Sequence, residues 1–405
     1  MIYLDNSATT KPLPRVTAAV AAAMEEDFGN PSSLHRLGLT AEKTLKGARK
    51  AVAASLRVKD TEITFTGSGT EADNTALFSM ARAGRRRGKK IITSDGEHPA
   101  VLEACRALSE NGFSIAYIRT DHRGFPDLAQ LEEELTEDTI LVSMMAVNNE
   151  LGTIFPIKEI SQMVRSKTKA LLHTDGVQAY GKVNLALGTG LVDAASISAH
   201  KVHGPKGVGA LWVRENLHLQ PFVYGGGQER GFRSGTENMP GIAGFGEAAR
   251  ILQEEGADRQ LAMAAARQRL MEGLLAQIPD ITINSPVKAY TGNGIPYAEG
   301  ARGLAEEDIL CCPAILNVSF LGCRGEVLLH SLEQKDIYVS TGSACSSNSK
   351  KKGSHVLQAA GLSFDQVEGA IRFSLSGDNT PEQMDQVVEE LSKIVASMRR
   401  LMRRR

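Results

Sequence analysis

The sequence predicts an α/β protein built on a mainly parallel sheet, and two observations lead to this prediction. Short apolar runs of strand type alternate with longer segments of helical periodicity through about the first 215 of the 405 residues. Alternation of this kind indicates strand–helix–strand units, in which helices cover both faces of the sheet. Hydrophobic residues make up 42% of the chain and charged residues 23%, which is typical of a globular protein of roughly two or three domains.

Seven strands are expected in this first part of the chain. They are residues 62–66, 90–94, 114–119, 140–144, 170–174, 194–198 and 209–213. The helices expected before and between them are residues 41–57, 70–87, 100–111, 127–135 and 157–167. Ligands of such sheets bind beyond the carboxyl ends of the strands, so the residues directly after each strand are the candidates for a functional site.

The pattern changes after residue 213. A Gly-rich stretch leads into long helical segments between about residues 241 and 277, and a polar stretch at 285–303 is expected to be a loop or an insertion. Later strands are expected at 315–320, 338–340 and 370–374, with helices at 325–335 and 381–400. We therefore expect a large domain, residues 15–254, and a small α+β domain, residues 255–405. An N-terminal segment, residues 1–14, is expected to pack with the small domain.

The charge balance excludes two classes of function. The 46 Lys and Arg residues nearly equal the 47 Asp and Glu residues, which gives a formal net charge of −1. We therefore expect no general binding of nucleic acid or of a membrane surface.

The first residues lack the basic and apolar regions of a signal peptide, and no apolar run reaches the ~20 residues that span a bilayer. These features predict a soluble, cytoplasmic protein.

The cysteines indicate one reactive thiol and no metal site. The five are Cys105, Cys311, Cys312, Cys323 and Cys345. Their odd number argues against a disulfide scaffold, and no pair has the spacing of a zinc site. Cys345 lies in a polar Gly/Ser-rich stretch followed by three lysines, whose charge would lower the pKa of its thiol. Because a cysteine is usually buried, this one is the candidate for chemistry.

Lys201 directly follows the strand at 194–198, in the segment SAHKVHGPKG (198–207). A lysine in this place can act as a nucleophilic amine toward a carbonyl, although a solvated basic turn is an equally good interpretation of the segment alone. Asp175 and Gln178 at another strand end favour the first interpretation. An acid beside the ring nitrogen of pyridoxal phosphate would keep that nitrogen protonated, and Asp175 could also cap the next helix.

Three weaker signals lie at the same predicted edge. The turn GSGT (67–70) opens a helix and could bind an anion through free N–H groups. It has no Walker lysine, and no GxGxxG occurs in the chain, which disfavours nucleoside triphosphates and dinucleotides. His98 could stack on a flat ring, and Asn148 and Asn149 offer amides. Each of these would also pass for an ordinary turn or helix cap.

Together these segments resemble the cysteine desulfurases of the NifS/IscS type, which are fold-type I pyridoxal-phosphate enzymes of class V aminotransferase type. The resemblance extends from YLDNSATT (3–10) to RFS (372–374), nearly the whole chain. It implies a large domain with a mainly parallel seven-stranded sheet and a smaller α+β domain. It also implies a homodimer.

The resemblance implies a role for each matching residue. Lys201 matches the Schiff-base lysine, Asp175 the acid on the pyridine nitrogen and Gln178 the partner of the phenolic oxygen. His98 would stack on the ring and carry protons, and Asn149 would face the ring. The matching phosphate contacts are Gly69, Thr70, Ser198, His200 and, from a second subunit, Thr236. The matching substrate and sulfur contacts are Arg372 for the carboxylate, with Asn30 nearby, and Cys345 for the persulfide.

The activity that the resemblance implies is conversion of L-cysteine to L-alanine, with the sulfur passed through Cys345 to an acceptor protein of iron–sulfur cluster assembly or of tRNA or cofactor thiolation. A selenocysteine lyase or an aminotransferase of the same fold is the near alternative, and a non-catalytic scaffold is the distant one. Two stretches depart from the usual pattern: residues 285–312 are longer, and residues 349–353 are rich in lysine. Both leave the identity of the acceptor open.

Overall fold

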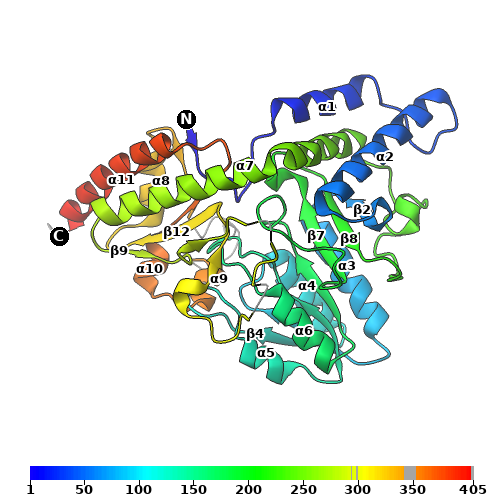
Figure 1. The fold of residues 1–405 in the computed structure, drawn as a ribbon, viewed down its shortest axis with the longest axis horizontal. Coiled ribbons are helices and arrows are strands. Elements are labelled where there is room, and N and C mark those ends of the chain that lie inside the picture. Colours follow the sequence, from blue (N-terminus) through cyan, green and yellow to red (C-terminus); the bar gives the residue numbers. More distant parts are fainter. Residues whose placement is uncertain (293, 298–299, 342–352, 403–405) are drawn as a thin grey trace.

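A seven-stranded sheet forms the centre of the computed structural model, which describes residues 1–292, 294–297, 300–341 and 353–402 (Figure 1). Its strand order is β2-β8-β7-β6-β5-β3-β4. Neighbouring strands are parallel from β7 to β4, whereas β8 is antiparallel to both β7 and β2. The predicted fold class is confirmed. The strand bounds are β2 Ile63–Thr66, β3 Lys90–Ser94, β4 Ser114–Ile118, β5 Thr139–Ser143, β6 Leu171–Asp175, β7 Ala194–Ser198 and β8 Gly209–Val213.

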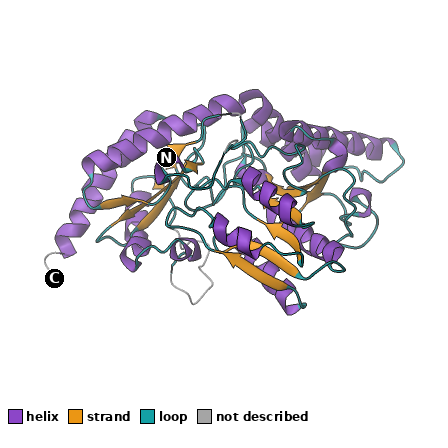
Figure 2. Ribbon diagram, turned by 60° about the horizontal axis from the view of Figure 1, so that its bottom comes forward, coloured by secondary structure: helices purple, strands orange, loops and turns teal. Residues whose placement is uncertain are grey.

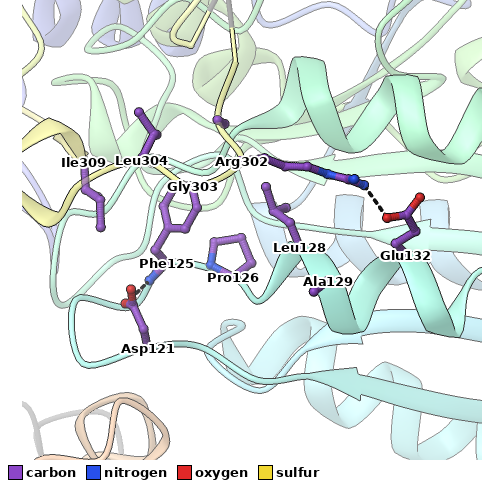
Figure 3. Close-up of a pocket in the computed structure, with 11 residues that line it drawn as sticks. Asp121, Phe125, Pro126, Leu128, Ala129, Glu132, Arg302, Gly303, Leu304 and Ile309 are labelled. Atoms are coloured by element: carbon purple, nitrogen blue, oxygen red, sulfur yellow. Dashed lines mark hydrogen bonds and ion pairs between the residues drawn. The ribbon is translucent and has the colours of Figure 1, made fainter.

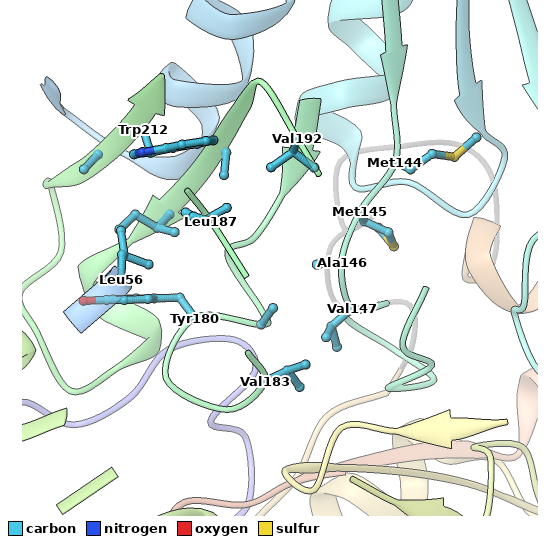
Figure 4. Close-up of a cluster of buried hydrophobic side chains, with 14 of the residues drawn as sticks. Leu56, Met144, Met145, Ala146, Val147, Tyr180, Val183, Leu187, Val192 and Trp212 are labelled. Carbon is cyan, nitrogen blue, oxygen red and sulfur yellow. The ribbon is translucent and has the colours of Figure 1, made fainter. Parts of the chain in front are cut away.

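Helices cover both faces of this sheet (Figure 2). Alternate strand residues point to opposite faces, so Trp212 of β8 joins one hydrophobic core and its neighbour Leu211 joins the other. Figure 4 shows the first core, where Trp212, Tyr180 and Leu187 lie among aliphatic side chains. The covering helices on that side are α2 Arg36–Leu56, α5 Leu128–Glu134 and α6 Ile157–Lys167, and those on the other are α3 Gly69–Gly84 and α4 Pro99–Glu110.

A second hydrophobic core surrounds a three-stranded antiparallel sheet of order β14-β12-β9 and is formed by residues from Ala266 onward together with Ile2 and Leu4. The long helix α7 (Met239–Gln277) runs through residue 254, where the sequence places a domain boundary, and joins both parts (Figure 1). The strands are β9 Ile281–Ile283, β12 Ile315–Phe320 and β14 Ala370–Ser374, and the helices are α8 Gly325–Glu333, α9 His355–Ala359, α10 Phe364–Glu368 and α11 Pro381–Met402.

The N-terminal segment contacts both parts of the molecule. Its strand β1 (Ile2–Tyr3) pairs in parallel with β13 (Ile337–Tyr338) of the second part. The following helix α1 (Pro14–Glu25) lies along α7 (Figure 1). Residues 5–10 connect the two and cross the edge of the large sheet.

The stretch 285–312 carries a short parallel pair, β10 (Lys288–Ala289) and β11 (Leu310–Cys311). Part of it packs against α5 and encloses a cavity of about 350 Å³ (Figure 3). There Arg302 binds Glu132 of α5 at 2.6 Å. None of the candidate catalytic residues lines this cavity.

No helix in the described ranges is both long and apolar enough to cross a membrane.

Arg267 of α7 binds the stretch 285–312 to the second core. The side chain is fully buried, and its guanidinium donates to the carbonyl oxygens of Ile315, Val287 and Pro286 at 2.8, 3.1 and 2.6 Å.

Arg267→Met would remove three charge-assisted hydrogen bonds and leave buried carbonyls unpaired. We expect a loss of about 3 kcal/mol in the free energy of unfolding, measured by urea titration. Arg269→Met, which breaks only an exposed ion pair with Asp385, is the matched control and should leave the midpoint nearly unchanged.

His173 links three neighbouring strands inside the large sheet. Its Nδ1 lies 2.9 Å from Ser143 Oγ of β5, and its Nε2 lies 3.0 Å from Ser196 Oγ of β7. Burial lowers the pKa of His173 to about 3. Burial also raises the pKa of Asp73, whose Oδ1 lies 3.7 Å from His173 Nε2, so burial disfavours the charged form of both groups.

We therefore expect acid to weaken the fold through His173. The unfolded chain takes up this proton near pH 6.5 and the folded chain only near pH 3, so the stabilisation is present above pH 6.5 and is lost as the pH falls. The stability difference between the wild type and His173→Asn should shrink by about 2 kcal/mol from pH 7.5 to 5. Urea titrations at the two pH values measure it, and exposed His330→Asn is the control. An unchanged difference would contradict a neutral His173.

Candidate active site

The carboxyl ends of five strands meet at one edge of the large sheet and carry most of the residues singled out in the sequence. Gly69 and Thr70 follow β2, and His98 follows β3. The remaining ones are Asn149 after β5, Asp175 and Gln178 at the end of β6, and Ser198, His200 and Lys201 at the end of β7. Their meeting follows from the parallel order of the strands.

Lys201 ends the short 3₁₀ turn Ala199–Lys201 that directly follows β7. Its Nζ donates to the carbonyl oxygen of Ala8 at 2.9 Å and to that of Ser7. Its positive charge lowers the pKa values of both His98 and Asp175, in each case as a smaller effect than burial. The amine, the imidazole and the carboxyl group are therefore close enough to influence one another.

Asp175 is buried at the end of β6, and burial raises its pKa. Its Oδ1 accepts a hydrogen bond of 2.9 Å from the Val177 N–H, as in a cap of the following turn. The second carboxylate oxygen could accept from a cationic N–H donor. A ring N–H⁺ placed there would stabilise the ionised carboxylate and would itself stay protonated.

His98 caps helix α4, with its Nδ1 accepting from the Ala100 N–H at 3.1 Å. Burial, assisted by the charge of Lys201, lowers the pKa of His98 to about 4. The ring is therefore neutral at physiological pH and carries its proton on Nε2. A neutral imidazole fixed in this way suits stacking on a flat ring and donation of one proton.

The turn after β2 brings backbone N–H groups to the end of β7. Ser68 caps α3 by accepting from the Glu71 N–H at 3.1 Å, and the first N–H groups of α3 have no partner within the helix. A Cβ on Gly69 would lie 2.7 Å from Val177 Cγ2, so only glycine allows this approach. With Ser198 and His200 nearby along β7, the turn offers the donors of an anion site.

Arg372 reaches the same edge from β14. It is only 4% exposed, and its Nη1 donates to the Asn149 carbonyl oxygen at 3.0 Å. Its Nη2 pairs with Asp5 Oδ1 at 3.0 Å. The predicted carboxylate-binding group thus lies beside the predicted ring contacts.

The N-terminal segment supplies contacts that the sequence did not reveal. The Ser7 carbonyl oxygen accepts from Gln178 Nε2 at 3.0 Å as well as from Lys201, and Thr10 N–H donates to the His200 carbonyl oxygen at 2.9 Å. The string YLDNSATT attracts attention only through the resemblance, because its backbone makes most of these contacts.

Two predicted residues lie elsewhere, and a third falls outside the described residues. Asn30 is exposed in the turn between α1 and α2, where its Oδ1 accepts from Ser32 N–H at 2.9 Å. Thr236 is exposed in the loop before α7. Cys345 lies outside the described residues. One chain therefore assembles the ring and carboxylate contacts but does not bring Asn30 to them.

Buried polar atoms at this edge fit pyridoxal phosphate and an amino-acid carboxylate. Among the residues that the structure describes, the buried atoms there without a hydrogen-bond partner include Ser7 Oγ, Asn149 Oδ1, Gln178 Oε1, Ser198 Oγ and Arg372 Nε. Buried polar groups are nearly always paired. Unpaired donors at one edge indicate a polar ligand there: the Ser198 hydroxyl suits a phosphate, and Arg372 Nε suits a carboxylate.

Comparisons with known proteins agree with this site. The aminotransferase class-V family matches residues 2–296. A cysteine desulfurase of Trichormus azollae is 41% identical over 403 residues, which cover 99% of this chain and 94% of the relative. A solved NifS-like protein has a TM-score of 0.86 at 39% identity and covers 98% of this chain and 99% of its own. The structure of SspA in complex with cysteine has a TM-score of 0.77 at 30% identity, over 93% of this chain and 99% of SspA.

These matches confirm the resemblance, the fold class and the cofactor inferred from the sequence. The chain therefore belongs to the aminotransferase class-V family and, within it, to the pyridoxal-phosphate-dependent cysteine desulfurases.

Proposed function

We propose that the edge around Lys201 converts L-cysteine to L-alanine and that Cys345 carries the released sulfur as a persulfide. The observation on which this proposal rests is the meeting of Lys201, Asp175, His98 and Arg372 at one edge. Lys201 Nζ would hold the cofactor, Asp175 its ring nitrogen and Gln178 Nε2 its phenolic oxygen. Bound pyridoxal phosphate supplies an electron sink for the carbanion at the substrate Cα.

The chain's own groups would then divide the work. Arg372 would bind the substrate carboxylate, a planar match that a lysine could not reproduce. Once the substrate amine has replaced it on the cofactor, Lys201 Nζ would remove the proton from the substrate Cα. His98 Nε2 carries a proton that it could donate to the substrate sulfur or to the carbon skeleton of the product. The Cys345 thiolate would form a bond to the substrate sulfur as the Cβ–S bond breaks, and reprotonation of the carbon skeleton would give alanine.

The other cysteines support the choice of Cys345. The four in the described residues, Cys105, Cys311, Cys312 and Cys323, are all buried. Burial raises the pKa of each thiol, that of Cys105 to about 12 and that of Cys312 to about 11. Since the thiolate is the nucleophile, none of these four is suited to the reaction. All four are also unbridged, which supports a reducing, cytoplasmic setting.

We also propose that the enzyme is a homodimer. The α1–α2 turn and the start of α2 expose large apolar side chains, among them Phe28 at 64% and Leu34 at 96%. An apolar patch of this kind is typical of an interface. The exposed Thr236 would then reach the cofactor phosphate of the second subunit, and Asn30 could approach its site. The acceptor of the sulfur would be a scaffold of iron–sulfur assembly or a thiolation enzyme.

Two variants separate the roles of Lys201 and Cys345. Lys201→Ala should lose the visible absorbance of the bound cofactor and all alanine formation. Cys345→Ser should keep the absorbance and lose persulfide formation, since serine cannot hold the sulfur. Absorbance spectra and alanine assays with L-cysteine measure both effects. Cys323→Ser is the control and should behave like the wild type; normal desulfuration by Cys345→Ser would refute its role.

Co-expressed variants test the shared site. Thr236→Asp places a negative charge against the cofactor phosphate, and Lys201→Ala removes the amine, so each homodimer should be inactive. If Thr236 serves the partner subunit, mixed dimers regain one intact site, and about a quarter of the wild-type activity should return.

The control pair is Lys201→Ala with Asp175→Ala. Both residues would serve their own chain, so every mixed dimer has two damaged sites and no activity should return. Recovery in this control, or none in the Thr236 pair, would contradict a phosphate site completed by the partner.

A further inference from the structure

Arg372 is paired with a carboxylate of its own chain at the place where the proposed function requires a substrate carboxylate. Its Nη2 lies 3.0 Å from Asp5 Oδ1, and the two side chains are 5% and 24% exposed. Its Nη1 is engaged by the Asn149 carbonyl oxygen, and within the described residues Nε has no partner. The buried guanidinium thus has one donor still unpaired, and its charge is already neutralised.

Asp5 is held in this position by its backbone. Asp5 forms a bridge with Ser374, two residues beyond Arg372 on β14. The next residues add hydrogen bonds to Ser374, from Asn6 N–H at 3.1 Å and from Ser7 N–H to Ser374 Oγ at 2.8 Å. The Tyr3 hydroxyl also donates to the Asp5 carbonyl oxygen at 3.1 Å. The carboxylate therefore stays within reach of Arg372 whether or not another anion is bound.

Two carboxylates on one guanidinium repel each other. A buried arginine with no counter-ion is costly, so Asp5 stabilises the site when no amino acid is present. When an amino acid enters, its carboxylate meets a group whose charge is already balanced, and the like charge of Asp5 opposes its binding. The same repulsion assists departure of the product, because Asp5 can pair again with Arg372 as the alanine leaves.

We propose that Asp5 is an exchangeable counter-ion of Arg372 that weakens the binding of both amino acids, L-cysteine and L-alanine, and so speeds product release. Asp5 is a positioning residue in this scheme, since it acts through Arg372. The inference rests on the proposed role of Arg372 as the carboxylate-binding group.

The test compares the binding of L-alanine with that of ethylamine, which is alanine without its carboxylate, to the holoenzyme by calorimetry. In Asp5→Asn the dissociation constant of L-alanine should fall by about tenfold, while that of ethylamine should not change. The KM for L-cysteine should fall, and kcat should also fall because alanine leaves more slowly. Asp5→Glu keeps the charge and should restore weak alanine binding.

Controls keep the outcome interpretable. Asp378→Asn removes another acid that is paired with an arginine, Arg259, and should change neither dissociation constant. Asp5→Ala removes the same charge with a smaller side chain and repeats the test if the asparagine variant does not fold. Weaker or unchanged alanine binding in the charge-removing variants, or an equal change for ethylamine, would overturn the proposal.

Arg372→Gln separates this inference from the proposed function. Loss of the preference for alanine over ethylamine in Arg372→Gln, with no effect of Asp5→Asn, would refute only the role of Asp5. A preference that survives Arg372→Gln would instead refute the role of Arg372 itself.

Discussion

The active-site edge depends on the N-terminal segment at residues 5–10 being bound from two sides. Ser374 of β14 holds its backbone by accepting hydrogen bonds from the N–H groups of Asn6 and Ser7. Lys201 and Gln178 of the large sheet bind the carbonyl oxygen of Ser7 from the other side. Because a buried backbone polar group must be paired, this segment cannot leave either part without exposing unpaired donors. It therefore fixes Arg372 relative to Lys201, although the two residues come from different sheets.

Hydrogen-bond pairing, rather than burial, separates the structural from the functional polar groups. His173 is buried, but both ring nitrogens face serine hydroxyls, so it serves the sheet. Gln178, Ser198 and Asn149 are buried with an atom unpaired, and they lie together. Unpaired buried atoms also occur elsewhere, as along α3 at Asp73, Thr75 and Ser79 and at Trp212 Nε1, so such an atom alone indicates little. Their convergence at one sheet edge, beside a lysine and an acid, is what distinguishes the site.

The large sheet could be predicted from the sequence because its inner strands are buried on both faces and appear as largely apolar runs, although the edge strand β4 is partly exposed. Each of the seven begins and ends within one residue of its expected bounds. Helix α2 begins at Arg36, five residues before the expected 41, because His35 caps it through Nδ1 and histidine is not a usual cap. Helix α1 and the short strands β1 and β9 gave no periodic signal of sufficient length. The side-chain chemistry of Lys201 and Asp175 was readable, whereas the carbonyl contacts of Ser7 have no sequence pattern.

The stretch 285–312 has a structural consequence near the site that its sequence did not suggest. Cys312 N–H donates to the Gly152 carbonyl oxygen at 2.7 Å, and Ile154 N–H donates to that of Leu310 at 2.9 Å. These bonds hold the loop after β5, which carries Asn149 and its contact with Arg372. Arg267 in turn ties the stretch to α7 through backbone carbonyls. A longer connection in this place therefore braces the loop that orients the carboxylate-binding arginine, and it does so through backbone hydrogen bonds that leave the chemistry of the site unchanged.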